Sequence, residues 1–194
     1  VDPEKNPDQF VGRKADLESL AQCLDEGQLV FLTGESGSGK SVLVKVGLRD
    51  CLTNDRRDLN LLPIVMSSYG ASEDWDADLA ARLASRFFDS LTAEARARLS
   101  YSERKRTTRE LMDLLRACES KIGRIPLLIF DQFDDYQNLH RSQFLRDRKW
   151  ITPEILVMEN RFWKAIREAL ETRILKVLLV ARQDRFVSLE SMRL

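Results

Sequence analysis

Four short runs of almost uninterrupted apolar residues recur along the chain, at residues 29–33, 61–66, 126–130 and 174–181. Apolar runs of about four to eight residues without polar alternation are typical of strands buried on both faces, as in a parallel sheet. The second run contains Pro63, which cannot donate a backbone hydrogen bond. We therefore expect that strand to lie at the sheet edge or to carry its proline near the start.

Between these runs, apolar residues return at the three- and four-residue spacing of helices that bury one face. The predicted stripes are Leu17, Leu20, Ala21 and Leu24; Leu79, Leu83 and Phe87; Leu111, Leu114, Leu115 and Cys118; and Ile155, Met158, Phe162, Ala165, Ile166 and Ala169. Gly27 is expected to stop the first helix, Thr107 and Glu110 form a capping-box pattern, and Thr152-Pro153 is typical of a helix start. We expect these stripes to form core rather than cofactor contacts.

Strands that alternate with helices predict an α/β fold of three layers. A parallel sheet should lie between two helical layers, with right-handed connections. The 194 residues are 43% hydrophobic, which is enough for a full core, and 32% charged. No stretch approaches the length of a membrane span, and no apolar signal segment opens the chain.

Charge, cysteines and histidine exclude several other classes of chemistry. The 31 basic and 31 acidic residues balance, so nucleic acid is not indicated, and Arg104-Lys105-Arg106 is typical of a solvated face. Cys23, Cys51 and Cys118 are widely spaced and indicate neither a disulfide framework nor a metal site. His140 lacks the neighbours of a triad or a zinc site, and we expect it in a loop. We expect a protein of the reducing cytoplasm.

A glycine-rich segment after the first apolar run carries the clearest chemistry. It has the spacing G-x-x-x-x-G-K-S and comprises Gly34, Glu35, Ser36, Gly37, Ser38, Gly39, Lys40 and Ser41, with Val42 opening a helix behind it. Glycines let such a loop turn its amide N–H groups inward, where a helix dipole favours an anion. We expect Lys40 to reach the β- and γ-phosphates of ATP or GTP, and the Ser41 hydroxyl to bind Mg²⁺. The alternative is a glycine-rich turn that happens to hold a lysine.

The third apolar run exits into an acidic segment, Asp131-Gln132-Phe133-Asp134-Asp135. Mg²⁺ prefers hard oxygen ligands and keeps several waters, so the single carboxylate of Asp131 at the strand end suffices to hold it. The alternative is a buried strand followed by a solvated acidic turn. Because another strand lies between Lys40 and Asp131 in the sequence, the chain fits the ASCE subclass of P-loop proteins, which has an extra strand between the Walker A and Walker B strands.

The fourth apolar run is followed at once by Arg182. Ligands of open parallel sheets bind outside the carboxyl ends of the strands, so Arg182 is expected to sense the γ-phosphate or the attacking water. The alternative for Arg182 is a surface ion pair. Arg185 lies further from the strand, and we expect it to be solvated or paired with Asp184.

Four segments together carry a family resemblance: FVGR at residues 10–13, GESGSGKS at 34–41, LLIFDQFDD at 127–135 and VLLVARQDRF at 177–186. They resemble the nucleotide-binding core of the STAND class of signal-transduction ATPases, relatives of the NACHT and AP-ATPase proteins. DQFDD is similar to the D-Q-F-E-E Walker B motif of a bacterial branch, and it is the most discriminating of the four. The resemblance spans nearly the whole chain.

The resemblance implies ATP and Mg²⁺ as ligands and gives roles to particular positions. These are Gly12 and Arg13 near the adenine or ribose, Lys40 and Ser41 on the phosphates and Mg²⁺, Asp131 on Mg²⁺, Asp134 or Asp135 at the attacking water, and Arg182 as the sensor. Many AAA+ ATPases carry a glutamate base directly after the Walker B aspartate, where this chain has Gln132. A neutral amide cannot accept a proton, so we expect slow hydrolysis.

Slow hydrolysis suits a switch better than a motor. By resemblance, the chain is expected to form a homo-oligomer through its NTPase domain in signal transduction or antiviral defence, with sensor and effector domains outside this segment. We expect residues 1–9 to be a linker or entry segment and 10–194 to be the nucleotide-binding domain of a larger protein, whose last strand and lid follow Leu194. The alternatives are a DNA-associated AAA+ or origin-recognition-like ATPase, a non-hydrolysing nucleotide-binding scaffold, and a small-molecule phosphotransferase, for which no lid segment is evident.

Overall fold

A computed structural model describes residues 13–70, 75–99 and 107–194. The predicted linker at 1–9, the segment 10–12 with Gly12, and the basic cluster at 104–106 lie outside the described residues. Within them, no helix combines the length and apolar character that a membrane crossing needs.

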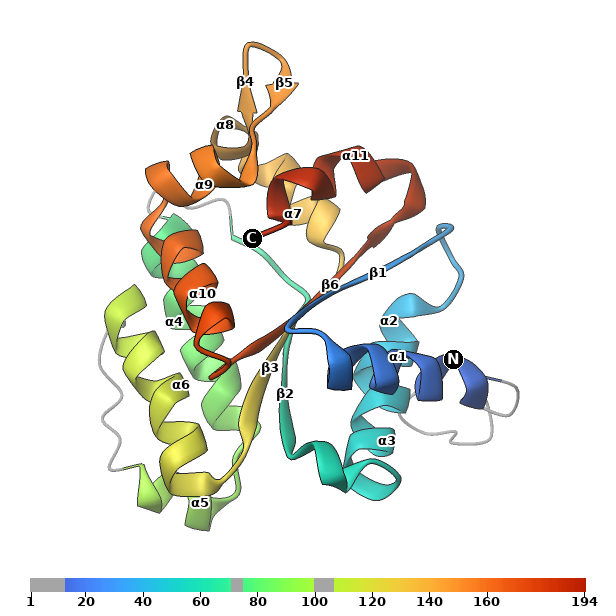
Figure 1. The fold of residues 1–194 in the computed structure, drawn as a ribbon, viewed down its shortest axis with the longest axis vertical. Helices are drawn as coiled ribbons and strands as arrows, with labels where there is room; N and C mark the ends of the chain where they lie inside the picture. Colours follow the sequence, from blue (N-terminus) through green and yellow to red (C-terminus); the bar gives the residue numbers. More distant parts are fainter. Residues whose placement is uncertain (1–12, 71–74, 100–106) are drawn as a thin grey trace.

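The centre of the molecule is a parallel four-stranded sheet (Figure 1). Its strands are β1 (Leu29–Gly34), β2 (Leu61–Met66), β3 (Ile125–Phe130) and β6 (Lys176–Arg182), in the order β1-β6-β3-β2. The predicted α/β fold with a parallel sheet is therefore confirmed. The strand between β1 and β3 in space is β6, whereas β2, which lies between them in the sequence, is at the far edge and pairs only with β3 among the described strands. That edge position accommodates Pro63.

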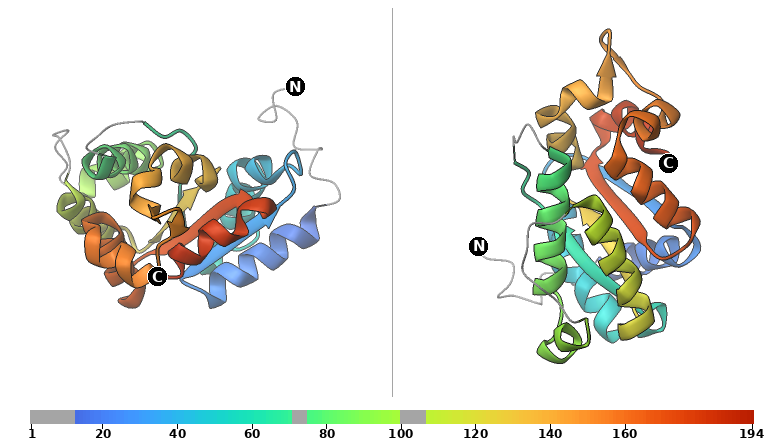
Figure 2. Two further views of the ribbon diagram at one scale, coloured as in Figure 1. Left: turned by 90° about the horizontal axis from the view of Figure 1, so that it is seen from above. Right: turned by 90° about the vertical axis from the view of Figure 1, so that its left-hand side faces the viewer.

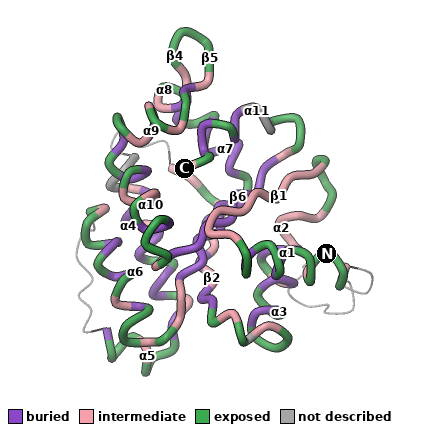
Figure 3. The backbone as a smooth tube through the Cα atoms, viewed as in Figure 1, coloured by how far each residue is buried: buried purple, intermediate pink, exposed green. Residues whose placement is uncertain are grey.

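Helices cover both faces of the sheet (Figures 1 and 2). One face carries α1 (Lys14–Glu26) and a continuous helical segment made of α2 (Lys40–Val42), the π-helical η3 (Leu43–Leu48) and α3 (Arg49–Asn54). The other face carries α4 (Trp75–Asp89), α6 (Thr108–Ile122) and α10 (Arg161–Glu171). The central strands β3 and β6 are buried on both sides, which explains their continuous apolar character, whereas β1 at one edge is only partly buried (Figure 3).

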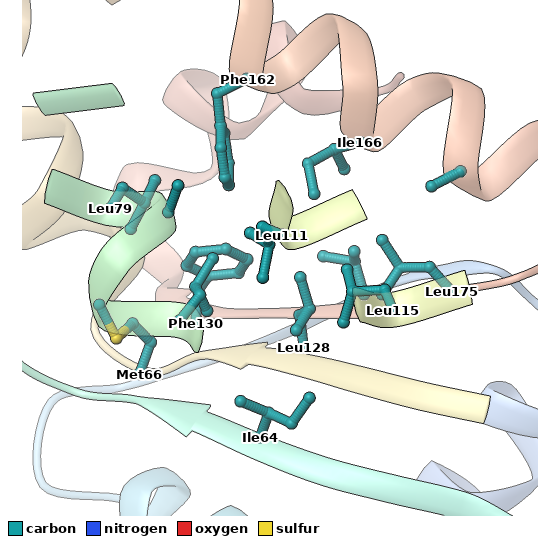
Figure 4. Packing of buried hydrophobic residues seen from close by; sticks show 14 of the residues in the cluster. Ile64, Met66, Leu79, Leu111, Leu115, Leu128, Phe130, Phe162, Ile166 and Leu175 are labelled. Carbon is teal, nitrogen blue, oxygen red and sulfur yellow. The ribbon is translucent and has the colours of Figure 1, made fainter. Parts of the chain in front are cut away.

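Two hydrophobic clusters fill the spaces between the layers because successive strand residues point to opposite faces. In β3, Leu128 and Phe130 face the larger cluster, while Leu127 and Ile129 face the smaller one under α1. Figure 4 shows the larger cluster, in which strand residues meet Leu111 and other side chains of the covering helices. Burying a side chain of this size contributes about 1.5–3 kcal/mol, so these layers hold the strand ends in place.

The remaining elements connect these layers. They are η4 (Arg57–Leu59), α5 (Ala93–Arg98), α7 (Phe133–Leu139), α8 (Arg141–Phe144), β4 (Leu145–Arg146), β5 (Lys149–Trp150), α9 (Pro153–Glu159), η5 (Gln183–Arg185), α11 (Phe186–Leu189) and η6 (Glu190–Met192). β4 and β5 form a small antiparallel hairpin that projects from the body (Figure 1). His140 lies in the turn between α7 and α8, as expected, but it is buried there.

The helix signals near Thr107 and Thr152 have different outcomes. The capping box is confirmed, since Thr107 Oγ1 accepts the Glu110 N–H at 3.3 Å and Glu110 Oε2 accepts the Thr107 N–H at 2.8 Å. The helix start at Thr152-Pro153 is confirmed, since α9 begins at Pro153 with Thr152 as its N-cap. The continuation of one helix through the whole stripe is wrong, because Asn160 ends α9 and caps α10 by accepting the Trp163 N–H at 3.1 Å. This break changes the helical phase, so Met158, predicted as core, is 77% exposed.

Candidate nucleotide-binding site

The glycine-rich loop joins the end of β1 to the start of α2. Gly37 and Gly39 have φ values of 76° and 79°, in the left-handed region that glycine adopts without steric cost. Any larger residue at these positions would be strained. The loop conformation therefore depends on the glycines that the sequence pattern supplies.

Lys40 folds back over this loop. Its Nζ donates hydrogen bonds to the carbonyl oxygens of Gly34 at 2.8 Å and Glu35 at 2.7 Å, and lies 3.4 Å from Ser38 Oγ. The ammonium group is thus held inside the curve of the loop by neutral carbonyl oxygens. A phosphate oxygen is a charged acceptor and would bind the ammonium group more strongly.

The strand register brings the three predicted motifs to one edge of the sheet. Gly34 lies opposite Arg182 in the β1–β6 pair, and Phe130, directly before Asp131, lies opposite Leu179 in the β3–β6 pair. Parallel strands end on the same side, so the glycine-rich loop, the acidic turn and Arg182 surround one space.

That space is a pocket of about 440 Å³. It is lined by Ser36, Gly37, Ser38, Gly39, Lys40, Ser41, Val42, Asp131, Gln132, Asp134, Asp135, Val180, Ala181 and Arg182. Of the predicted loop residues, Gly34 and Glu35 do not line it. Glu35 instead borders an adjoining hollow with Ser36 and Arg182.

Asp131 is buried and fixed at several atoms. Its N–H donates to the Met66 carbonyl at 2.8 Å, and its own carbonyl accepts the Tyr69 hydroxyl at 2.8 Å. Its carboxylate Oδ1 accepts the Ser41 hydroxyl at 2.9 Å, and its Oδ2 lies 2.9 Å from Lys45 Nζ. The carboxylate is thus held at the floor of the pocket.

The oxygen atoms at this floor suit a divalent cation. Asp131 Oδ2 is buried without a well-aligned hydrogen bond, and Ser41 supplies a second hard oxygen beside the carboxylate. These two residues could hold Mg²⁺ together with phosphate and water oxygens. When bound, Mg²⁺ would neutralise charge on the phosphates.

Arg182 and Asp134 form an ion pair across the pocket. Arg182 Nε donates to Asp134 Oδ2 at 2.8 Å, and this hydrogen bond raises the pKa of the guanidinium. Asp134 is buried, whereas Asp135 is exposed on the pocket wall and forms no ion pair with any described residue. Arg185 pairs with Asp184 at 3.6 Å, as one of the sequence alternatives predicted.

Gln132 makes the turn from β3 into α7. Its φ of 56° and ψ of 47° place a non-glycine residue in the left-handed region, and its exposed side chain borders the pocket. Such a conformation in a residue other than glycine, asparagine or aspartate is uncommon and is often found at functional sites.

Arg13, the first described residue, lies over the glycine-rich loop. Its Nη1 donates to the Ser38 carbonyl at 2.8 Å and its Nε to Asp16 at 2.9 Å. The guanidinium also limits the space beside Gly39, where an added Cβ would lie 3.0 Å from Nη1. Arg13 therefore contacts the loop backbone that borders the pocket.

Two residues near the site were missed by the sequence pattern. Tyr69 follows β2 without a motif of its own, and burial together with the nearby carboxylate of Asp131 raises its pKa well above the ordinary value. Lys45 lies one helical turn after Ser41, a spacing that places both side chains on one face and was the available signal.

Nearly the whole chain matches a known protein family. The family model described as novel STAND NTPase 1 matches residues 3–193. The chain belongs to the STAND NTPases. Among curated proteins, no sequence matches it.

Membership of the STAND NTPases confirms the resemblance inferred from the four sequence segments. It supports nucleotide binding as the function of this STAND NTPase. The family match also favours this assignment over the AAA+ and phosphotransferase alternatives.

Proposed function

We propose that this STAND NTPase binds ATP with Mg²⁺, hydrolyses it slowly and uses the bound nucleotide to control its own assembly. The observation that carries the proposal is the meeting of Lys40, Asp131 and Arg182 at one pocket from three different strand ends. ATP rather than GTP follows from the family resemblance. The proposed domain is residues 10–194 of a larger protein.

Each part of the pocket has a proposed role toward the triphosphate. The amides of the glycine-rich loop and Lys40 bind the phosphates, and Ser41 and Asp131 hold Mg²⁺. Arg182 senses the γ-phosphate, exchanging Asp134 for a more highly charged partner. Gly12 and Arg13 are proposed to contact the adenine or ribose, as the family resemblance implies, and the contact of Arg13 with the Ser38 carbonyl supports this role for Arg13.

Slow turnover follows from the acidic turn. Gln132 cannot act as a base, and Asp134 is buried and therefore less accessible to water than Asp135. Asp135 borders the pocket with an exposed carboxylate, so we propose that it orients the attacking water and accepts its proton as the general base. We expect a turnover number far below the ~10 s⁻¹ that is typical of enzymes.

Replacing Asp135 with asparagine should lower ATP turnover about 100-fold while leaving ATP affinity nearly unchanged, because a general base acts only on the chemical step. Asp134→Asn should have a smaller effect, since it only releases Arg182. Single-turnover hydrolysis and equilibrium ATP binding measure the two quantities. Asp147→Asn, in the distant hairpin turn, is the matched control. If neither Asp134→Asn nor Asp135→Asn lowers turnover, the non-hydrolysing scaffold is the better assignment.

The switch is proposed to act by population shift. The γ-phosphate offers contacts to Lys40 and Arg182 that a diphosphate lacks, so the triphosphate stabilises one state of the protein by that difference. In the proposed STAND arrangement, a sensor domain outside this segment determines which state is populated, and an effector domain outside it produces the output. A role in signalling or antiviral defence belongs to this proposal by family analogy alone.

Light scattering after size-exclusion chromatography tests the assembly step. With Mg²⁺ and a non-hydrolysable ATP analogue, the molar mass should be at least about twice that with ADP, since a closed homo-oligomer has at least two subunits. Lys40→Ala should keep the ADP-state mass under both conditions. Equal masses for the wild type in both nucleotides would argue against an oligomerisation switch.

A further inference from the structure

Lys45 and Asp131 form an ion pair at the floor of the pocket. Lys45 Nζ lies 2.9 Å from Asp131 Oδ2. The two side chains are very differently exposed: that of Asp131 is 1% accessible, and that of Lys45 is 41% accessible. The pair therefore joins a buried carboxylate to an ammonium group at the protein surface.

The ion pair balances the negative charge of Asp131 but does not give Oδ2 a well-aligned hydrogen bond. Oδ1 already accepts the Ser41 hydroxyl, while Oδ2 has no well-aligned hydrogen bond despite its short distance to the ammonium group. A buried carboxylate without a counter-charge is costly. Lys45 supplies that counter-charge at Oδ2, which is the carboxylate oxygen that accepts no hydrogen bond from any described residue.

Two other cations, Lys40 and Arg182, line the pocket and contact groups other than Asp131. Lys40 Nζ is bonded to the Gly34 and Glu35 carbonyls, and Arg182 is paired with Asp134. Among the described residues, Lys45 is the cation in ion-pair contact with Asp131.

The side chain of Lys45 is also partly exposed, so its ammonium group can move away from Asp131 into solvent. Its ammonium is strongly hydrated and sits on a flexible four-carbon stem, so rotation about that stem can carry it into solvent. The residue lies in the π-helical segment η3, one turn beyond Ser41. Short π-helical stretches within α-helices are rare and occur often at functional sites.

We propose that Lys45 is a built-in counter-ion that occupies Asp131 in the absence of metal and competes with Mg²⁺ for its carboxylate. This inference rests on the proposed use of Mg²⁺ with ATP. Metal binding releases the ammonium of Lys45 into solvent, and loss of metal returns it. Lys45 thus keeps the metal-free pocket folded and lowers the affinity of the site for Mg²⁺.

The test measures how strongly Mg²⁺ tightens the binding of a fluorescent, non-hydrolysable ATP analogue. The ratio of the dissociation constants in EDTA and in Mg²⁺ gives this coupling directly. Lys45→Met should increase the ratio about twofold to fivefold, the size expected when an ion pair with one solvent-exposed partner no longer competes. Lys45→Arg keeps the charge and should resemble the wild type, as should Lys14→Met on the surface of α1.

A second readout tests whether the Lys45–Asp131 ion pair stabilises the metal-free pocket. In EDTA, Lys45→Met should unfold at a lower temperature than the wild type, and Asp131→Asn in the same chain should restore much of the loss. If Lys45→Met does not fold, Lys45→Gln replaces it in both measurements. A clear Mg²⁺ effect in the wild type that neither neutral variant increases would overturn the inference alone. No Mg²⁺ effect in the wild type would overturn the proposed function as well.

Discussion

Replacing Lys40 with alanine is expected to weaken ATP binding by about 100-fold or more. The ammonium group of Lys40 lies inside the glycine-rich loop, on the carbonyl oxygens of Gly34 and Glu35, where a triphosphate would attract it. Removing one member of a closely held charge pair costs about 2–5 kcal/mol, and each 1.4 kcal/mol is a factor of ten in affinity. Isothermal titration calorimetry with ATP and Mg²⁺ measures the loss.

Lys14→Ala is the matched control for this variant. Lys14 lies on α1 with a side chain that is 81% exposed and pairs only loosely with Glu18 at 3.9 Å. It should bind ATP as the wild type does. Equal ATP affinity in Lys40→Ala and Lys14→Ala would show that the glycine-rich loop is not the phosphate site.

Replacing Asp131 with asparagine should abolish most of the dependence of ATP binding on Mg²⁺. Asparagine keeps the shape of the side chain and an oxygen for the Ser41 hydroxyl, but it removes the negative charge that a divalent cation requires. We expect at least a tenfold loss of the Mg²⁺ effect, since even residues that only support a metal ligand cost about 10–100-fold. Titration of a fluorescent ATP analogue in EDTA and in Mg²⁺ measures it.

Asp113→Asn controls for the change of charge. Asp113 is exposed on α6 and pairs with Arg116 at 3.3 Å, away from the pocket. Its variant should retain the full Mg²⁺ effect. An Asp131→Asn protein that retained it too would leave Asp131 as a structural residue only.

Much of the fold follows from the sequence because parallel strands have a strong local signature. Each of the four apolar runs became a strand of the sheet, and Pro63 lies on the edge strand that its missing N–H requires. The meeting of Asp131 and Arg182 follows from the same rule, since both directly follow or end parallel strands. These features depend on residues that are close in sequence.

The features that the sequence pattern missed depend on contacts between distant residues or on unusual backbone. To predict the pairing of Arg182 with Asp134, one would need to know how far the two side chains reach across the pocket. The hairpin turn uses Asp147 and Arg148 at positive φ, without the glycine that marks such turns. Asn160 interrupts a helical stripe that continues on both sides of it, so periodicity alone did not reveal the break.

Three cations at the site have protein partners in the structure. Lys40 is bonded to its own loop, Arg182 to Asp134, and Lys45 to Asp131. In the proposed mechanism, the triphosphate replaces the protein partners of Lys40 and Arg182, and Mg²⁺ replaces Lys45 at Asp131. Ligand binding would then exchange two ion pairs and the hydrogen bonds of Lys40, and this would couple the ligand to the conformation of the strand ends.

The nucleotide and metal positions can be measured together in a crystal structure with Mn²⁺ and a non-hydrolysable ATP analogue, in which anomalous scattering locates the metal. We expect one metal ion beside Ser41 and Asp131, with Lys40 moved from its loop carbonyls onto the phosphates and Arg182 facing the same triphosphate. A nucleotide bound elsewhere, or a metal ion remote from Asp131, would contradict this expectation.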